Sequence, residues 1–115
     1  MCLSAIMWGE ARGEAPIGQV AAAYSAINRK ADPRYPKDIC KIMKQPDQYE
    51  FFWKKGFPAE RLLAEFKPTA QAILEGRIDD PTQGKTHFYR YDIPTPKWAL
   101  GKKKQRIGNH IFVEV

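Results

Sequence analysis

Two glutamates four residues apart, Glu10 and Glu14, are the first side chains along this 115-residue chain that could carry chemistry. The apolar face of a predicted helix runs through Leu3, Ile6 and Met7. The next position on that face is Glu10. A carboxyl group in apolar surroundings has a raised pKa, because burial disfavours the charged form, and a nearby negative charge acts in the same direction. Such a group can be a general acid near neutral pH.

The same spacing has a simpler interpretation. If the helix ends at Gly9, Glu10 and Glu14 are solvated loop acids that pair with Arg12. Structural ion pairs also perturb acids, so the spacing alone leaves both interpretations open.

The elements that must position these acids follow from periodicity and turn signals. Helices are expected at residues 3–11, 16–31, 38–43, 59–66 and 68–75, and strands at residues 86–91 and 109–115. Residues 45–56 are aromatic-rich but have the composition of a loop. The two strands are expected to pair antiparallel across a loop at residues 92–106. The predicted fold class is α+β, a mostly helical single domain over residues 1–115 with a small antiparallel β element near the C-terminus.

The overall charge points to an anionic partner. The net charge is +6, and the basic residues cluster only at Lys102, Lys103, Lys104 and Arg106. Such a cluster fits nucleic acid, a membrane surface or an acidic wall polymer, and equally a solvated loop. No apolar run approaches the ~20 residues of a membrane span. The N-terminus lacks a basic n-region, so no signal peptide is expected.

The two cysteines, Cys2 and Cys40, could pair, but two free, partly buried thiols are the expectation. Cys40 with His87 or His110 supplies the parts of a Cys–His amidase or peptidase. The apolar run around Cys40 argues for an inert thiol instead. Two histidines without HExxH spacing do not make a zinc site, so neither a metal nor another cofactor is expected.

Several short motifs, taken in order, resemble one known family. These are GEARGE (residues 9–14), GQVA (18–21), NR (28–29), YP (35–36), IC (39–40), Gln48, DPT (80–82), THF (86–88), Trp98 and IGNHIF (107–112). They resemble the spore-cortex-lytic, SleB-type family of cell wall hydrolases over nearly the whole chain.

The resemblance implies a lysozyme-like α+β catalytic domain that cuts the glycan strand of peptidoglycan between N-acetylmuramic acid and N-acetylglucosamine. It places the family's catalytic acid/base on Glu10. A lytic transglycosylase of this type can work with a single carboxylate, whereas ordinary glycosidases use two. If cleavage is hydrolytic, Glu14, Asp47 or Asp80 would position the water.

Further polar and aromatic side chains are candidates for substrate binding. They are Glu14, Gln48, Tyr49, Thr86, His87, Tyr89, Asn109 and His110. Ordinary core packing competes with this role for the aromatic residues, and a hydrogen-bonded structural role competes for the two histidines.

A chain that starts at its first motif resembles a phage endolysin. That implies a bacteriolytic monomer, made in the host cytoplasm and released by a separate membrane-permeabilising protein to the wall or periplasm. The alternative outside enzymology is a basic nucleic-acid-binding module. The 19 Lys and Arg residues permit it, but no nucleic-acid-reading motif is present.

Overall fold

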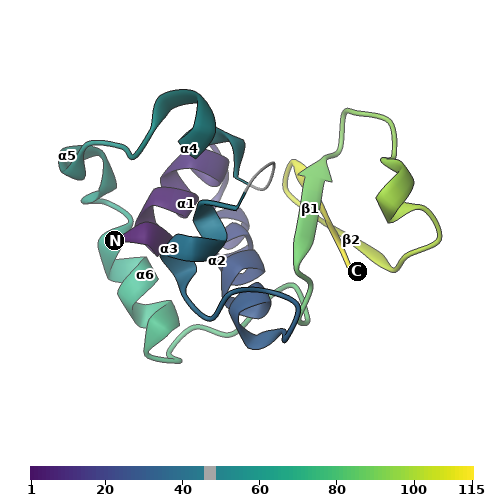
Figure 1. The fold of residues 1–115 in the computed structure, drawn as a ribbon, viewed down its shortest axis with the longest axis horizontal. Helices are drawn as coiled ribbons and strands as arrows, with labels where there is room; N and C mark the ends of the chain where they lie inside the picture. Colours follow the sequence, from purple (N-terminus) through teal and green to yellow (C-terminus); the bar gives the residue numbers. More distant parts are fainter. Residues whose placement is uncertain (46–48) are drawn as a thin grey trace.

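The computed structural model describes residues 1–45 and 49–115, and Figure 1 shows helices gathered on one side and a small sheet on the other. The helices are α1 (Cys2–Ala11), α2 (Pro16–Ala31), α3 (Ile39–Met43), α4 (Glu50–Lys55), α5 (Glu60–Leu63), α6 (Lys67–Leu74) and the 3-10 turn η1 (Lys97–Ala99). The strands are β1 (His87–Arg90), β2 (Lys104–Ile107) and β3 (His110–Val113). The α+β class with a dominant helical part is confirmed.

Helices α1 and α2 form the centre of the helical part. Pro16 opens α2 in a position where its missing N–H is not needed, and Asp32 ends it with an extended backbone. Ala23 and Ala26 of α2 are completely buried in the same core as Ile6 and Met7 of α1. Small side chains on α2 allow close approach of the two helices. Leu3, Ile6 and Met7 are buried as predicted, but Ser4 and Ala5 are buried too, so α1 is enclosed on more than one face.

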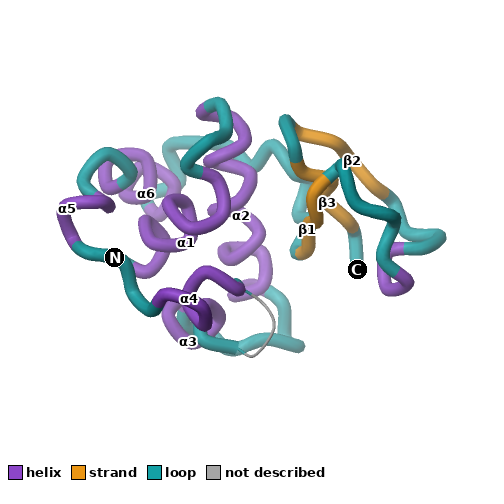
Figure 2. Tube along the Cα trace, turned by 90° about the horizontal axis from the view of Figure 1, so that it is seen from above, coloured by secondary structure: helices purple, strands orange, loops and turns teal. Residues whose placement is uncertain are grey.

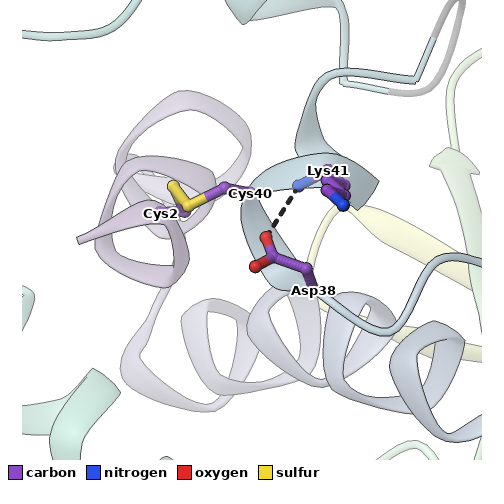
Figure 3. The surroundings of a disulfide bond; sticks show 4 residues. All are labelled: Cys2, Asp38, Cys40 and Lys41. Carbon is purple, nitrogen blue, oxygen red and sulfur yellow. Dashed lines mark hydrogen bonds between the residues drawn. A yellow bond between two sulfur atoms is a disulfide. The ribbon is translucent and has the colours of Figure 1, made fainter.

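The expectation of two free thiols is wrong, because Cys2 and Cys40 form a disulfide (Figure 3). It joins the start of α1 to α3, whose first turn is capped by Asp38 through the backbone N–H of Lys41. The two residues are 38 apart in sequence, and their Cα atoms lie 5.3 Å apart because α3 packs on α1. This proximity arises from tertiary packing, and it removes Cys40 as a nucleophile.

The predicted loop at residues 45–56 contains a helix, α4, which corrects that expectation. Phe51 of α4 is buried in the helical core, and Tyr49 just before it is 1% exposed. The aromatic content therefore indicated a buried segment, and packing overrides the weak helix propensity of these residues. Gly56, with φ of +73°, ends the helix.

The predicted pairing of the two strands is confirmed, with His87 opposite Val113. The loop between them, however, contains a third strand. β2 pairs with the other edge of β3, which gives the order β1-β3-β2. The signal missed was a two-residue turn at Gly108 and Asn109, with a positive φ at Gly108. Three of the four residues of β2 are charged or polar, which hid its strand character.

Both faces of the sheet are covered, and this fixes it beside the helices (Figure 2). Phe112 packs with Ile107 and with Ala21 of α2 on one face. On the other face Val113 and Tyr89 pack against Ala99 of η1. No helix among residues 1–45 and 49–115 has the length and apolar content to cross a membrane.

Candidate active site

A groove of about 560 Å³ separates the helical part from the sheet. Its walls are formed by Gly9 and Glu10 of α1, Glu50 of α4, residues 88–90 of β1, Ile93 and His110. A second hollow of about 300 Å³ shares Gly9, Glu10, Arg90 and His110 and extends past residues 11–14. Glu10 lies where the two hollows meet. The arrangement suits an extended polymer that passes over one central carboxyl group.

Glu10 is positioned by the last turn of α1, which continues past Gly9 to Ala11. The helix therefore does not end where the solvated-acid interpretation required. A Cβ at Gly9 would lie 2.2 Å from the ring of Phe51, so only glycine lets α1 and α4 approach this closely. That contact brings Glu50, the residue before Phe51, to the same groove as Glu10.

The pKa of Glu10 is raised to about 7. Burial is the largest cause, the negative charge of Glu50 adds to it, and the positive charge of Arg29 opposes it. Among the described residues no hydrogen bond or ion pair holds the Glu10 carboxylate. Glu10 is thus a partly exposed carboxyl group that holds its proton near neutral pH.

Glu14 has the opposite environment. Its two carboxylate oxygens accept hydrogen bonds from the backbone N–H and the side-chain amide of Asn109, at 2.9 and 3.0 Å. Partial burial raises its pKa, but these hydrogen bonds outweigh burial and the net pKa is lowered. Gly108 suits this turn, because it has φ of +61° and a Cβ there would displace the Glu14 oxygen from its hydrogen bond. Glu14 therefore links the α1–α2 connection to the β2–β3 turn through two hydrogen bonds.

Arg12 pairs with neither acid. Its guanidinium donates to the backbone carbonyl of Trp8 at 2.9 Å and lies 4.2 Å from the centre of the Trp8 ring. The ion pairs of Arg12 with Glu10 and Glu14 that the solvated-acid interpretation required are therefore absent from the described structure.

Two of the predicted substrate-binding residues line the groove. Tyr89 of β1 and His110 of β3 both border it, and His110 also borders the second hollow. The Tyr89 ring, however, packs on the other face of the sheet with Ala99 and Trp98. His110 is 5% exposed, its Nδ1 has no hydrogen-bond partner among the described residues, and burial lowers its pKa. It is a neutral side chain beside Glu10.

The other candidates lie elsewhere or have other partners. Tyr49 is buried in the helical core, where its hydroxyl bonds that of Ser25 at 2.9 Å, so it cannot present a face to a sugar. Thr86 is 6% exposed and bonds Nδ1 of His87 at 2.8 Å. Asn109 is engaged with Glu14. Gln48 and Asp47 lie outside the described residues.

His87 sits on β1 away from the groove, between Tyr35 and Trp98. Its Nε2 contacts the Tyr35 hydroxyl at 3.3 Å. Burial, together with the positive charges of Arg29 and Arg34, lowers its pKa to about 4. With both ring nitrogens engaged and Cys40 oxidised, the Cys–His amidase interpretation has no reactive pair.

Asp80 has a structural role. It accepts hydrogen bonds from Asn28, Thr82 and the backbone N–H of Gly84, and so holds the turn before β1. Its oxygens are directed into that turn, which leaves it without a catalytic contact in the described groove. Among the described residues no group of three or more His, Cys, Asp or Glu side chains could hold a metal ion.

Sequence reasoning missed four groove residues: Phe88, Arg90, Ile93 and Glu50. Glu50 was detectable in principle, because it follows Tyr49 at the start of an apolar segment that had to be buried. Arg90 forms an ion pair with Asp92 at 3.1 Å, so its charge in the groove is partly balanced. Ile93 lies in the segment beyond β1, for which the sequence predicted only a loop.

The fold and groove define a class of protein: a lysozyme-like α+β domain whose cleft, between a helical part and a small sheet, is lined by the carboxyl groups of Glu10 and Glu50. The chain belongs to the Cell Wall Hydrolase family, whose model matches residues 13–113. The matched residues begin after Glu10, so the match to the family model does not include this residue.

Known proteins support this placement. The chain is 29% identical to the spore cortex-lytic enzyme of Halalkalibacterium halodurans over 92% of its own length and 32% of that protein. It is similar to the catalytic domain of the Bacillus cereus SleB protein, with a TM-score of 0.81, 25% identity, and coverage of 98% of this chain and 87% of that chain. It is similar to the catalytic domain of germination-specific lytic transglycosylase SleB from Bacillus anthracis, with a TM-score of 0.80, 25% identity, and coverage of 98% and 91%. The chain spans about a third of the length of the full spore cortex-lytic enzymes that it matches.

Proposed function

We propose that this chain is a peptidoglycan-degrading glycosidase that cuts the glycan strand between N-acetylmuramic acid and N-acetylglucosamine, as a lytic transglycosylase with Glu10 as its acid and base. The observation that carries the proposal is the position of Glu10 at the junction of two hollows, with its pKa raised to about 7. Family membership and the similarity to a lytic transglycosylase support the substrate class.

In the proposed reaction, protonated Glu10 donates its proton to the glycosidic oxygen, and the bond from that oxygen to the anomeric carbon of muramic acid breaks. The sugar's own C6 hydroxyl then attacks that carbon and gives its proton to the Glu10 carboxylate. The products are a free 4-hydroxyl on glucosamine and a 1,6-anhydro muramic end, with no water consumed. Such acid–base assistance contributes about 10²- to 10⁴-fold in rate.

The state of Glu14 supports chemistry with one carboxylate. Both oxygens of Glu14 accept hydrogen bonds from Asn109, so moving it toward a substrate would break both contacts. Glu50 is exposed and paired with Lys54 at 3.2 Å, at the rim of the groove. We therefore assign Glu50 to tuning Glu10, and we assign the substrate contacts to Tyr89 and His110.

The setting in which the chain works is part of the same proposal. The Cys2–Cys40 disulfide favours an oxidising compartment such as the periplasm or the wall. The net charge of +6 favours approach to anionic wall material. We propose that the chain acts there as a monomer in a bacteriolytic, endolysin-like role after release from the cytoplasm by a membrane-permeabilising partner, and that nucleic acid is not its ligand.

Digestion of purified peptidoglycan tests the chemistry. Wild-type protein and Glu10→Gln are incubated with sacculi, and the soluble fragments are analysed by mass. We expect 1,6-anhydro muropeptides from the wild type and at least about 100-fold fewer from the variant. Reducing muramic ends would overturn the transglycosylase step but keep the glycosidase. Cleaved peptide stems with intact glycan would overturn both.

A further inference from the structure

The segment at residues 91–106, here called the arm, connects β1 to the end of β2 and contains η1. It lies at the end of the molecule opposite α5 and α6 (Figures 1 and 2). The arm has five Lys and Arg residues and one Asp, a net charge of +4 out of the chain's +6. Its single acid, Asp92, is already paired with Arg90.

The basic side chains of the arm are exposed and lack acidic partners. They are Lys97, Lys102, Lys103, Lys104 and Arg106. In the described part of the chain none of the five forms an ion pair. Glu114 is next to this segment, because its backbone N–H donates to the carbonyl of Lys103, but its carboxylate pairs with none of the five. The surface therefore retains a concentrated positive charge.

The strand geometry arranges part of this charge in a row. Alternate residues of a strand share a face, so Lys104 and Arg106 project from the same face of β2, about 7 Å apart. Gln105 and Ile107 take the opposite face and are less exposed. The Arg106 guanidinium lies 4.0 Å from the centre of the Tyr91 ring, which orders it without neutralising it.

Protection of a sheet edge accounts for only part of this pattern. β2 is an edge strand, and lysine on an edge discourages pairing with another chain. That explains Lys104. It does not explain Lys102 and Lys103, which precede the strand, or Lys97 in η1.

We propose that the arm is a binding surface for a linear phosphodiester polymer of the cell wall, which holds the enzyme on walls that carry such a polymer. The proposal rests on the proposed function, because Ile93 of the arm also lines the Glu10 groove. A glycan strand in that groove therefore passes the start of the arm, while Lys104 and Arg106 project from the sheet face opposite to that of His110. Lysine ammonium groups are suited to phosphate as compact point charges, and a row of them matches a regularly charged chain.

Three of the four exposed large apolar residues of the arm contact neighbouring groups, and Leu100, which is 61% exposed, is the exception. Trp98 is 43% exposed, but its ring packs against His87 and Tyr89 at centroid distances of 5.4 and 5.9 Å. Tyr91 lies under Arg106, and Ile93 faces the groove. These contacts favour a wall polymer over a lipid surface.

Co-sedimentation with sacculi tests the proposal without interference from cleavage. The Glu10→Gln protein is mixed with sacculi that carry a polyol phosphate polymer and with the same sacculi after chemical removal of that polymer. We expect about 10-fold tighter binding to the polymer-bearing walls, lost in about 0.5 M salt because screening weakens exposed charges. Soluble poly(glycerol phosphate) should compete for the binding.

The variant K102Q/K103Q/K104Q should lose the preference. The matched control K30Q/K41Q/K44Q removes three exposed lysines outside the arm and should keep it. Thermal unfolding of both variants verifies that they are folded. If the control loses as much binding as the arm variant, net charge alone is responsible and the proposal is overturned.

Two further results would overturn the proposed ligand. Equal binding to stripped sacculi that retain peptide stems would mean that the arm recognises stem carboxylates. Tighter binding to vesicles of anionic phospholipid than to poly(glycerol phosphate) would mean that it recognises a membrane. Cleavage of stripped sacculi by the wild-type protein is measured in parallel. Loss of that activity would refute the proposed function, whereas its presence with no polymer preference would refute only this inference.

Discussion

Glu10 and Glu14 are separated by one helical turn in sequence, yet they stand in opposite environments. Glu10 ends α1, has no hydrogen-bond partner among the described residues, and has its pKa raised to about 7. Glu14 follows the helix, accepts two hydrogen bonds from Asn109, and has a lowered pKa. The partners of a carboxylate, more than its place in the chain, thus decide whether it holds a proton or fastens two segments together.

The largest expected difference between the two acids is in activity. Glu10→Gln removes the transferable proton and should lower the rate of glycan cleavage by about 10²- to 10⁴-fold. Glu14→Gln keeps Glu10 intact and should retain a far larger share of the activity. The comparison is made by turbidity loss of sacculi with both variants at equal folded concentration. Equal losses would contradict the division of roles.

The second difference is in stability. At neutral pH Glu10→Gln should raise the free energy of unfolding, whereas Glu14→Gln should lower it. In the unfolded chain a glutamate ionises near 4.5, so the raised pKa of Glu10 costs stability increasingly from pH 4.5 to about 7. Glu10→Gln should therefore stabilise the protein by about 1–3 kcal/mol at pH 8 and have no such effect at pH 4.

Glu14 should behave in the reverse manner. Its lowered pKa means that it stabilises the fold above pH 4.5 and loses this contribution as the pH falls through its folded-state pKa. Glu14→Gln should cost about 1 kcal/mol at pH 7, because the site is partly exposed, and less in acid. Urea unfolding at pH 4 and pH 8 measures both variants. If both variants changed the free energy of unfolding in the same direction at pH 8, the opposite environments assigned to Glu10 and Glu14 would be refuted.

A glycine allows a close contact near each of the two acids: Gly9 beside Phe51, and Gly108 beside Glu14. Gly9→Ala would place a methyl group against the Phe51 ring, and Gly108→Ala would place one against Glu14 at a φ of +61°. Each should destabilise the protein by about 1–2 kcal/mol in thermal unfolding. Gly9→Ala should also reduce cleavage, because Phe51 and the adjacent Glu50 must move. Full activity of Gly9→Ala would indicate that the groove does not need this contact.

The smallest expected effect concerns Glu50. Its negative charge raises the pKa of Glu10, so Glu50→Gln should lower that pKa and shift the alkaline limb of the pH–rate profile toward acid. The shift should be less than about one pH unit, because Glu50 is exposed and its charge is screened. Glu65→Gln, an exposed acid outside the groove, is the control and should leave the limb in place.

The sequence predicted most of the fold where local signals were strong. Pro16, Asp32 and Gly76 marked helix limits correctly, and Glu10 was found because a carboxylate interrupted an apolar face. Helix α4 was missed because only burial of Tyr49 and Phe51 in the core makes it helical. Strand β2 was missed because its charged residues lack strand propensity and acquire a partner only when β3 is present.

The site was harder to predict than the fold because it is assembled across distant segments. Of the residues predicted to bind substrate, Tyr89 and His110 border the groove, whereas Tyr49 is in the core, and Thr86 and His87 bond each other away from the groove. The disulfide was missed for the same reason. Nothing in the sequence places Cys40 near Cys2 until α3 packs on α1.

Direct titration of Glu10 tests the central assignment. The carboxyl carbons of ¹³C-labelled glutamate are followed by NMR from pH 3 to 9, and the Glu10 resonance is assigned by its absence in Glu10→Gln. We expect a midpoint near 7 for Glu10 and one below 4.5 for Glu14. A Glu10 midpoint near 4.5, as for any surface glutamate, would contradict the account.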